Sequence, residues 1–403
     1  MADTRLAGAD VVRALACLMV VAHHVAQRVA PEVLPPAGTW TVLSITMGAF
    51  GVSAFFVLSG YLLSRPFWLA LDAGERMPSL RIYAIRRGAR ILPGLWLALT
   101  VTFLLSFTVL RFPFDGILVL RYLSGLFLVS GFHWLTWFPV EFNGPLWSIG
   151  AEIISYAALP ICLMLLFRLP VRGWPARLAW LAVIAAIVGL QFLALRYLQP
   201  DAFGRGWEHG TVGGAKFWWP NYSPFGFFAI FAVGALAAGV QVQVARLRSG
   251  WFDLLALAGL AIAIGTMVWL YPVADGFGLA NVPYGFPFFP IGVALILIAT
   301  PSSVALFRVT ETAPVAYIAR VSFGVYVWHY LLMEIVRVLW QPRYIYWGMT
   351  NVSAWAWISL GVVALSFLVA TLSYALLEKP VIRWARSLEG RATPNPTLSP
   401  AAG

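Results

Sequence analysis

Two ionisable side chains that could work on a substrate lie in the first apolar segment of the chain. Residues 9–29 read ADVVRALACLMVVAHHVAQRV and carry Arg13 and His24 in a stretch otherwise fit to cross a bilayer. Such groups are costly at membrane depth and usually mark a site or a pathway. A helix returns the two residues to nearly the same face, about 16 Å apart along its axis, and turns His23 about 100° away from His24. An interfacial Asp10–Arg13 ion pair and one histidine bonded between helices would explain the same residues.

An arginine cluster leads into a later apolar segment. It comprises Arg81, Arg86, Arg87 and Arg90, and Ile91-Leu92-Pro93 follows it. In a helix, Arg90 shares a face with Arg87 and lies equally close to Arg86. Guanidinium groups bind phosphate through forked, charge-assisted hydrogen bonds, so the cluster fits a phosphate-bearing ligand. It also fits simple topogenic charge in contact with anionic lipid.

A carboxylate, Glu152, follows the segment NGPLWS at 143–148 by about one helical turn. If that span enters from the outer face, Glu152 lies roughly 8 Å below its outer end and His24 roughly 9 Å below the same surface. Equal depth would permit a carboxylate–imidazole contact that orients the ring and raises its basicity. Equal depth does not by itself bring the two helices together, so this contact stays open at this point.

A late apolar segment carries a second histidine in a polar stripe. Ser322, Tyr326 and His329 lie at positions i, i+4 and i+7, and Glu334 follows further along the segment. A single intramembrane histidine often only bonds two helices together. The added tyrosine and serine favour the wall of a site.

Composition identifies the kind of protein that must position these groups. Of 403 residues, 61% are hydrophobic and 11% charged, and the mean hydropathy is +0.83. We therefore predict an all-α integral membrane protein with one membrane domain at 1–389. Continuous apolar runs exclude a β-barrel, whose strands alternate over about ten residues. The net charge of +11 lies in loops, where it orients the chain, so the expected partner is a lipid bilayer and not nucleic acid.

Ten apolar segments are long enough to cross a bilayer. They cover roughly 10–30, 41–64, 90–110, 144–167, 178–198, 223–243, 251–271, 286–300, 321–340 and 352–376. An eleventh candidate at 117–132 is interrupted by Arg121.

Basic residues decide between ten and eleven crossings. With ten spans and a cytoplasmic N-terminus, most loop arginines and lysines lie inside, including those at 168–177. Eleven spans would move the later basic loops outside. We therefore predict ten transmembrane helices, cytoplasmic N- and C-termini, an interfacial or re-entrant segment at 117–132, and a disordered cytoplasmic tail at 390–403. The first segment is too long and too polar for a cleaved signal peptide and is expected to stay as a span.

Several kinds of site have no sequence support. Cys17 and Cys162 both lie in apolar segments, so no disulfide framework is predicted. The chain carries no Walker-type loop, no dinucleotide fingerprint, and no C-x-x-C or H-E-x-x-H pattern, so no metal is predicted.

Taken in order, these segments resemble the acyltransferase-3 family of integral membrane acyltransferases. Six elements from about Asp10 to Arg383 carry the resemblance: Arg13 with His24 after ten intervening residues, the signature GVSAFFVLSGY at 51–61, the R-x-x-R element Arg87–Arg90, the W-S-x-x-x-E element Trp147–Glu152, a late-span motif ending in His329, and Glu378-Lys379-Pro380.

The resemblance implies transfer of an acyl group, usually acetyl, from a cytoplasmic acyl-CoA to a hydroxyl group. The acceptor would be a glycan, such as an exopolysaccharide or lipopolysaccharide precursor, or another small hydroxylated molecule. The expected location is the inner (cytoplasmic) membrane of a bacterial-type cell, and a homo-oligomer is compatible with the sequence. The CoA phosphates would be held by arginines at the inner mouth: Arg13, Arg86, Arg87 and Arg90.

The resemblance also suggests catalytic roles. His24 would be the general base for the acceptor hydroxyl or would take the acyl group transiently, and Glu152 would orient it. His329 and Tyr326 would line the acceptor side or polarise the thioester carbonyl.

The chain departs from the family pattern in places. Ser53 stands where many members carry an acidic residue, and Glu334 is not part of the pattern. An appended SGNH-hydrolase-like domain is missing, so a stand-alone form with one acyl-transfer step is expected. Acylation of a secondary metabolite such as a macrolide stays open. From other classes, a proton-coupled transporter or a lipid-binding scaffold would also be multispanning.

Overall fold

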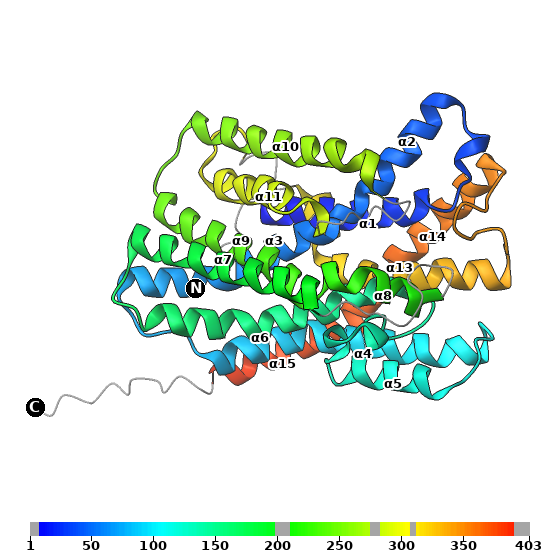
Figure 1. Ribbon diagram of the computed structural model, residues 1–403, viewed down its shortest axis with the longest axis horizontal. Helices are drawn as coiled ribbons and strands as arrows, with labels where there is room; N and C mark the ends of the chain where they lie inside the picture. The colour runs from blue at the N-terminus through cyan, green and yellow to red at the C-terminus, as the bar shows by residue number, and fades with distance from the viewer. Residues whose placement is uncertain (1–7, 198–209, 275–282, 307–311, 391–403) are drawn as a thin grey trace, which may run out of the picture.

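The computed structural model describes residues 8–197, 210–274, 283–306 and 312–390, which form a bundle of long helices (Figure 1). Within these ranges, ten helical stretches are long and apolar enough to cross a membrane, which confirms the predicted all-α membrane class and the number of spans. Their principal helices are α1 (Ala9–Ala26), α2 (Pro36–Thr46) with α3 (Gly51–Ala73), α4 (Leu80–Thr108), α6 (Trp147–Phe167), α7 (Gly173–Tyr197), α9 (Pro224–Val244), α10 (Gly250–Leu270), α11 (Phe288–Ala299), α13 (Ala313–Leu339) and α14 (Val352–Ser373).

The helix α4 begins earlier than the predicted span at 90–110. Its first residue is Leu80, and the hydroxyl of Ser79 caps it by accepting from the N–H of Ile82. The apolar pattern leaves the arginines of this region out of the predicted span. Arginine is nevertheless a good helix former, so the helix that begins at the cap continues through them. The arginine cluster is therefore held on a regular helix.

The segment predicted at 117–132 does not cross the bundle. Its helix α5 (Gly116–Leu126) has 11 residues, about 16 Å of rise, and lies beside α4 (Figure 1). The chain after it returns into the bundle, where Trp137, Val140 and Asn143 are fully buried. This returning segment, 127–146, leads directly into α6.

The centre of the bundle is a close crossing of α3 and α9. A Cβ added at Gly60 would lie 2.0 Å from the carbonyl oxygen of Phe231, and one added at Gly234 would lie 1.9 Å from that of Val57. The indole of Trp68 also donates to the carbonyl of Ala235 at 2.7 Å. Small residues that let backbones touch are typical of helix contacts in membranes.

An ion pair fixes one end of this crossing. Arg177 of α7 donates to both carboxylate oxygens of Asp72 of α3, at 2.6 and 2.7 Å, and to the carbonyl of Gly239. Gln243 of α9 donates to the same carboxylate at 2.7 Å. This end holds the basic connections after α3, α6 and α9, and we call it the inner end, in keeping with the predicted orientation.

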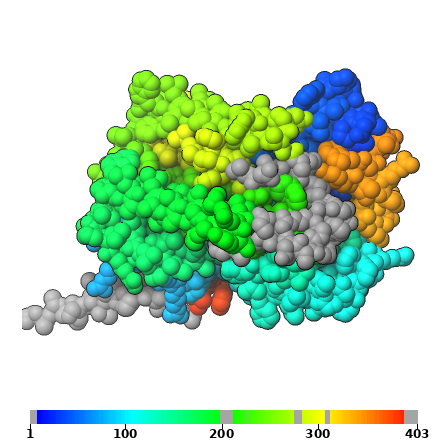
Figure 2. All heavy atoms as spheres, in the orientation of Figure 1, coloured from blue at the N-terminus to red at the C-terminus, as the bar shows by residue number. Residues whose placement is uncertain are grey.

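At the outer end, hydrogen bonds and packing connect the first helix to the segment between α13 and α14. Beyond α1, the N–H of Met349 donates to the carbonyl of Arg28 and that of Ala30 to Met349, both at 2.9 Å. Val42 of α2 packs in the same cluster as Val29. Figures 1 and 2 show α2 (blue) and the connection from α13 to α14 (orange) side by side.

The described part of the chain ends on the inner side. After α14, a short π-helix (Tyr374–Glu378) leads into α15 (Lys379–Gly390), which packs on α4. The tail predicted to be disordered, except for Gly390, lies outside the described residues.

The close crossing predicts a strong effect of one methyl group. Gly234→Ala should lower the stability of the folded protein by about 1–3 kcal/mol, because the added carbon overlaps a backbone carbonyl that cannot move aside. Thermal unfolding in detergent would measure it. Gly265→Ala in α10 is the matched control, since an added Cβ there meets no atom within 4 Å. Equal melting temperatures for the two variants would contradict the close approach.

Candidate functional site

The two predicted histidines meet inside the bundle. His24 of α1 and His329 of α13 are joined by a hydrogen bond of 3.0 Å between Nδ1 of His24 and Nε2 of His329. His329 is 1% exposed, whereas His24 is partly exposed to a cavity. The structure thus brings together residues 305 positions apart.

The hydrogen bonds around His329 assign the proton positions. Nδ1 of His329 lies 3.0 and 2.9 Å from the carbonyl oxygens of Val325 and Tyr326, which can only accept. In the neutral ring Nδ1 therefore carries the proton and Nε2 is the acceptor. His24 must then donate from Nδ1, and its own Nε2 is left with a lone pair for a ligand.

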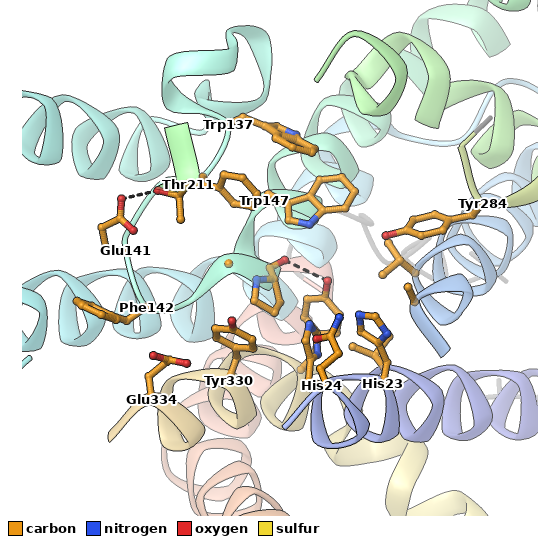
Figure 3. A pocket seen from close by; sticks show the side chains of 18 residues that line it. His23, His24, Trp137, Glu141, Phe142, Trp147, Thr211, Tyr284, Tyr330 and Glu334 are labelled. Carbon is orange, nitrogen blue, oxygen red and sulfur yellow. Dashed lines mark hydrogen bonds between the residues drawn. The ribbon is translucent and has the colours of Figure 1, made fainter. Parts of the chain in front are cut away.

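The cavity beside His24 has a volume of about 320 Å³ (Figure 3). Its walls come from α1, the returning segment 127–146, the start of α6 and α13. Aromatic rings form much of the lining: Trp137, Phe138, Phe142, Trp147, Tyr284, Tyr326 and Tyr330. His23 also lines it and donates from Nδ1 to the carbonyl of Thr46. A small, largely apolar pocket with a few converging polar groups is the usual form of a ligand site.

Tyr326 joins the wall of this pocket to the start of α6. Its hydroxyl lies 2.6 Å from that of Ser148, and both hydroxyls bond the carbonyl of Pro145, at 3.0 and 3.1 Å. Of the predicted stripe, Tyr326 lines this pocket, and His329 is connected to it through the hydrogen bond to His24.

The predicted contact between Glu152 and His24 is wrong. The carboxylate of Glu152 instead accepts from the hydroxyls of Ser59, at 2.7 Å, and Tyr156. Gly48 lies beside His23, and Ser59 is eleven positions further inward, roughly 16 Å by helical rise. The prediction assumed that α6 starts at the outer surface, but the returning segment 127–146 starts it within the bundle.

Glu152 lies instead near the arginine cluster. Tyr83, in the first turns of α4, donates to the carbonyl of Tyr156 at 2.9 Å, and both Tyr83 and Tyr156 interact electrostatically with Glu152 and Arg87. This places the carboxylate toward the inner end.

Three of the four predicted arginines gather there. Arg13 interacts electrostatically with Arg90 and Arg87, and its guanidinium lies 3.5 Å from Asp10. Arg90 in turn interacts with Tyr156 and with Glu378 of the π-helix. Arg86 is exposed on the outside of the same helix. The inner end thus concentrates positive charge about 16 Å along α1 from His24.

Two buried carboxylates in the pocket were not predicted as site residues. Glu334 pairs with Arg28 and Arg337, and Glu141 pairs with Arg121 and accepts from Thr211. The sequence does contain a signal for the pair of Arg28 and Glu334. Arg28 follows His24 by four residues and Glu334 follows His329 by five. The two opposite charges therefore lie at similar depth once the two histidines meet. Among the described residues, no three His, Cys, Asp or Glu side chains gather as metal ligands.

One family model and several curated proteins match the chain. The model of the acyltransferase-3 family, described as an acyltransferase domain, matches residues 6–372. The chain is similar to acyltransferase MdmB of Streptomyces mycarofaciens, at 30% identity over 203 residues, 48% of each chain. It is similar to peptidoglycan O-acetyltransferase OatA of Listeria monocytogenes, at 24% identity over 396 residues, 92% of this chain and 55% of the relative. O-acetyltransferase OatA of Staphylococcus aureus is 22% identical over 397 residues, 93% and 57% of the two chains.

The chain spans about half the length of these curated relatives. No solved structure matches it.

The proton assignment can be measured directly. At alkaline pH, where imidazoles are neutral, His23, His24 and His329 should carry their proton on Nδ1. Nitrogen NMR of protein labelled on histidine, assigned with single His→Gln variants, distinguishes the two tautomers. His133 is an internal control, because its Nδ1 accepts from the N–H of Leu135 and its proton belongs on Nε2. An Nε2 proton on His329 would reverse the direction assigned to the bond with His24.

Proposed function

The chain belongs to the acyltransferase-3 family, and from this premise we propose that it transfers an acyl group, in the first instance acetyl, from cytoplasmic acyl-CoA to an acceptor hydroxyl. One observation carries the proposal: α1 connects an arginine-rich inner end with a histidine-lined outer pocket. A long, flexible donor can be held by its phosphates at one end and present its thioester at the other.

The donor half of the site consists of the arginines. Arg13, Arg87 and Arg90 gather at the inner end, where their guanidinium groups would bind the CoA phosphates. Arg86, exposed on the same turns of α4, would contact them from the surface. The pantetheine arm would then extend along α1 toward His24.

The acyl-transfer step follows from the proton positions. Nε2 of His24 removes the proton of the acceptor hydroxyl as its oxygen attacks the thioester carbonyl. The tetrahedral intermediate collapses, the C–S bond breaks, and the CoA sulfur takes the proton from His24. Transient acylation of Nε2 is the alternative order of the same bond changes.

His329 is a positioning residue in this scheme. Its two bonds to backbone carbonyls fix its ring, so Nε2 keeps accepting from His24 and stabilises the imidazolium that forms. Tyr326 and Ser148 hold the start of α6 against α13 and shape the acceptor side. Polarisation of the thioester carbonyl by the Tyr326 hydroxyl is part of the same proposal.

Glu152 belongs to the donor half. It accepts from Ser59 and Tyr156 and interacts with neighbours of Arg87, so its charge helps to fix the arginine-rich end. It would act on donor binding rather than on the imidazole.

The acceptor enters from the outer side. The aromatic pocket opposite the arginines supports a glycan or another hydroxylated molecule as acceptor, and the reaction would take place in the cytoplasmic membrane of a bacterial-type cell. A metabolite such as a macrolide is the alternative within the same chemistry. It would be distinguished by supplying each acceptor class to the purified protein.

The general base can be tested by acyl transfer. Purified protein in lipid vesicles, given acetyl-CoA and crude cell-envelope glycan, should release CoA and acetylate the glycan. His24→Ala should lower kcat by about 10²–10⁴-fold, because the acceptor hydroxyl loses its base. His133→Ala, at a histidine that does not line the pocket, is the matched control and should keep the wild-type rate. Full activity in His24→Ala would show that His24 is not the general base.

Substitutions at the donor end should change the KM for acetyl-CoA. Arg90→Ala should raise the KM for acetyl-CoA by about 10–100-fold, since a charge-assisted bond to phosphate is lost. Arg168→Ala, an exposed arginine in another inner connection, should leave that KM unchanged. Wild-type protein that turns over no acyl-CoA would instead favour a transporter.

Because Glu152 lies in the donor half, its substitution should have a different kinetic effect from that of His24. Glu152→Gln should raise the KM for acetyl-CoA several-fold while kcat and its pH profile stay close to those of the wild type. A fall in kcat with a shifted pH profile would place the carboxylate back in contact with the imidazole.

A further inference from the structure

A buried glutamate held between two arginines bounds the outer end of the pocket. Glu334 lines the pocket, and its side chain is 8% exposed. Oε1 accepts from Nη2 of Arg28 at 2.9 Å, and Oε2 accepts from Nε of Arg337 at 2.6 Å. The Arg28 guanidinium also lies over the rings of Tyr330 and Tyr344, 5.1 and 5.6 Å from their centroids. The carboxylate is therefore fixed in place as a hydrogen-bond acceptor.

The position of Glu334 relative to His24 defines a second contact point. Glu334 lies five residues after His329 on α13, about 7.5 Å further outward. Between them, the ring of Tyr330 packs edge-on against His24, with centroids 5.0 Å apart. A ligand that presents one hydroxyl to His24 therefore extends past Tyr330 toward Glu334.

A second carboxylate faces the same region from the opposite wall. Glu141, on the returning segment, pairs with the buried Arg121 and accepts from Thr211. Figure 3 shows Glu141 and Glu334 at one end of the pocket, with Phe142 between them and His23 at the far end. The two walls are tied together, because Arg337 lies over the ring of Phe142 at 5.8 Å.

This combination suits one chemical class of ligand. Fixed carboxylates accept hydrogen bonds from hydroxyl groups. Each has about four lone-pair sites, and the contacts described above use two of them. Aromatic faces such as those of Trp137 and Phe142 cover the apolar face of a ring. An apolar ring with a single hydroxyl would leave both glutamates without the donors they are placed to receive.

We propose that Glu334, with Glu141 opposite, forms the subsite that selects among the acceptors proposed above, and that it favours a ring bearing several hydroxyl groups, such as a sugar unit. One hydroxyl reaches Nε2 of His24 while others donate to the two glutamates. This inference rests on the proposed acyl transfer and narrows its acceptor class. It assigns recognition to a residue outside the family pattern, so the choice of acceptor is set by this chain.

The test compares two kinds of acceptor in the same reconstituted protein. Oligosaccharides from cell-envelope glycan supply many hydroxyl groups, and n-butanol supplies one. Glu334→Gln should raise the half-saturating concentration of the oligosaccharides by about 10–100-fold, because Gln binds hydroxyl donors more weakly than a carboxylate does. Acetyl transfer to n-butanol and to water, and the KM for acetyl-CoA, should not change.

Two further variants keep the test decisive. Glu141→Gln removes the opposite carboxylate from an independent ion pair and should give the same selective loss even if Glu334→Gln folds poorly. Glu32→Gln, an outer-end glutamate outside this pocket, is the control and should match the wild type. Equal losses with oligosaccharide and n-butanol, or no loss with either, would overturn the subsite. Absence of acetyl transfer to any acceptor in the wild type would overturn the proposed function itself.

Discussion

The hydrogen bond between His24 and His329 is the contact on which the arrangement of this bundle depends. It joins the first helix to the ninth span, and the two backbone carbonyls that hold His329 make it directional. Burying a neutral imidazole inside a bundle costs little free energy only when each ring nitrogen has a hydrogen-bond partner or faces a cavity. Here that requirement fixes three nitrogens and leaves the fourth, Nε2 of His24, facing a cavity. The backbone hydrogen bonds beyond α1 also tie the first helix to the connection that follows α13.

The balance of charged groups inside the bundle differs between its two ends. Guanidinium groups gather at the inner end, where Arg13 lies near Arg87 and Arg90. At the outer end, each buried glutamate is matched by arginine, so neither wall of the pocket carries an uncompensated charge. Between them the lining is aromatic and aliphatic. This separation permits two chemically different ligands to occupy one continuous helix bundle.

The sequence was sufficient for the parts that depend on local patterns. Continuous apolar runs predicted the ten spans, and helical spacing placed Arg13 and His24 on one face of α1. Helical spacing likewise placed Tyr326, which lines the pocket, near His329 on one helix. The number of spans also followed from the distribution of basic loops, because eleven crossings would have put the arginines at 168–177 on the wrong side.

The sequence-based predictions that were wrong, or that could not be made, concern contacts between segments far apart in the chain. Depth was counted from the apparent start of each span, and this holds for α1 but not for α6, which begins after a chain segment buried within the bundle. Glu152 therefore pairs with Ser59 and not with His24. The adjacency of α1 and α13 has no local signal, because the two helices are about 300 residues apart. The pairing of Arg28 with Glu334 could have been inferred from opposite charges at one depth, but only once that adjacency was known.

The distance along α1 has a consequence for how energy enters the proposed reaction. A nucleotide bound at the inner end would never leave its side, and only the acyl group at the tip of its arm would travel the 16 Å or so to the outer pocket. Moving one elementary charge across a membrane costs or releases about 2.3 kcal/mol per 100 mV. An acetyl group is neutral, so its passage does no electrical work. The thioester would supply the driving force, and the barrier to ions would stay sealed throughout.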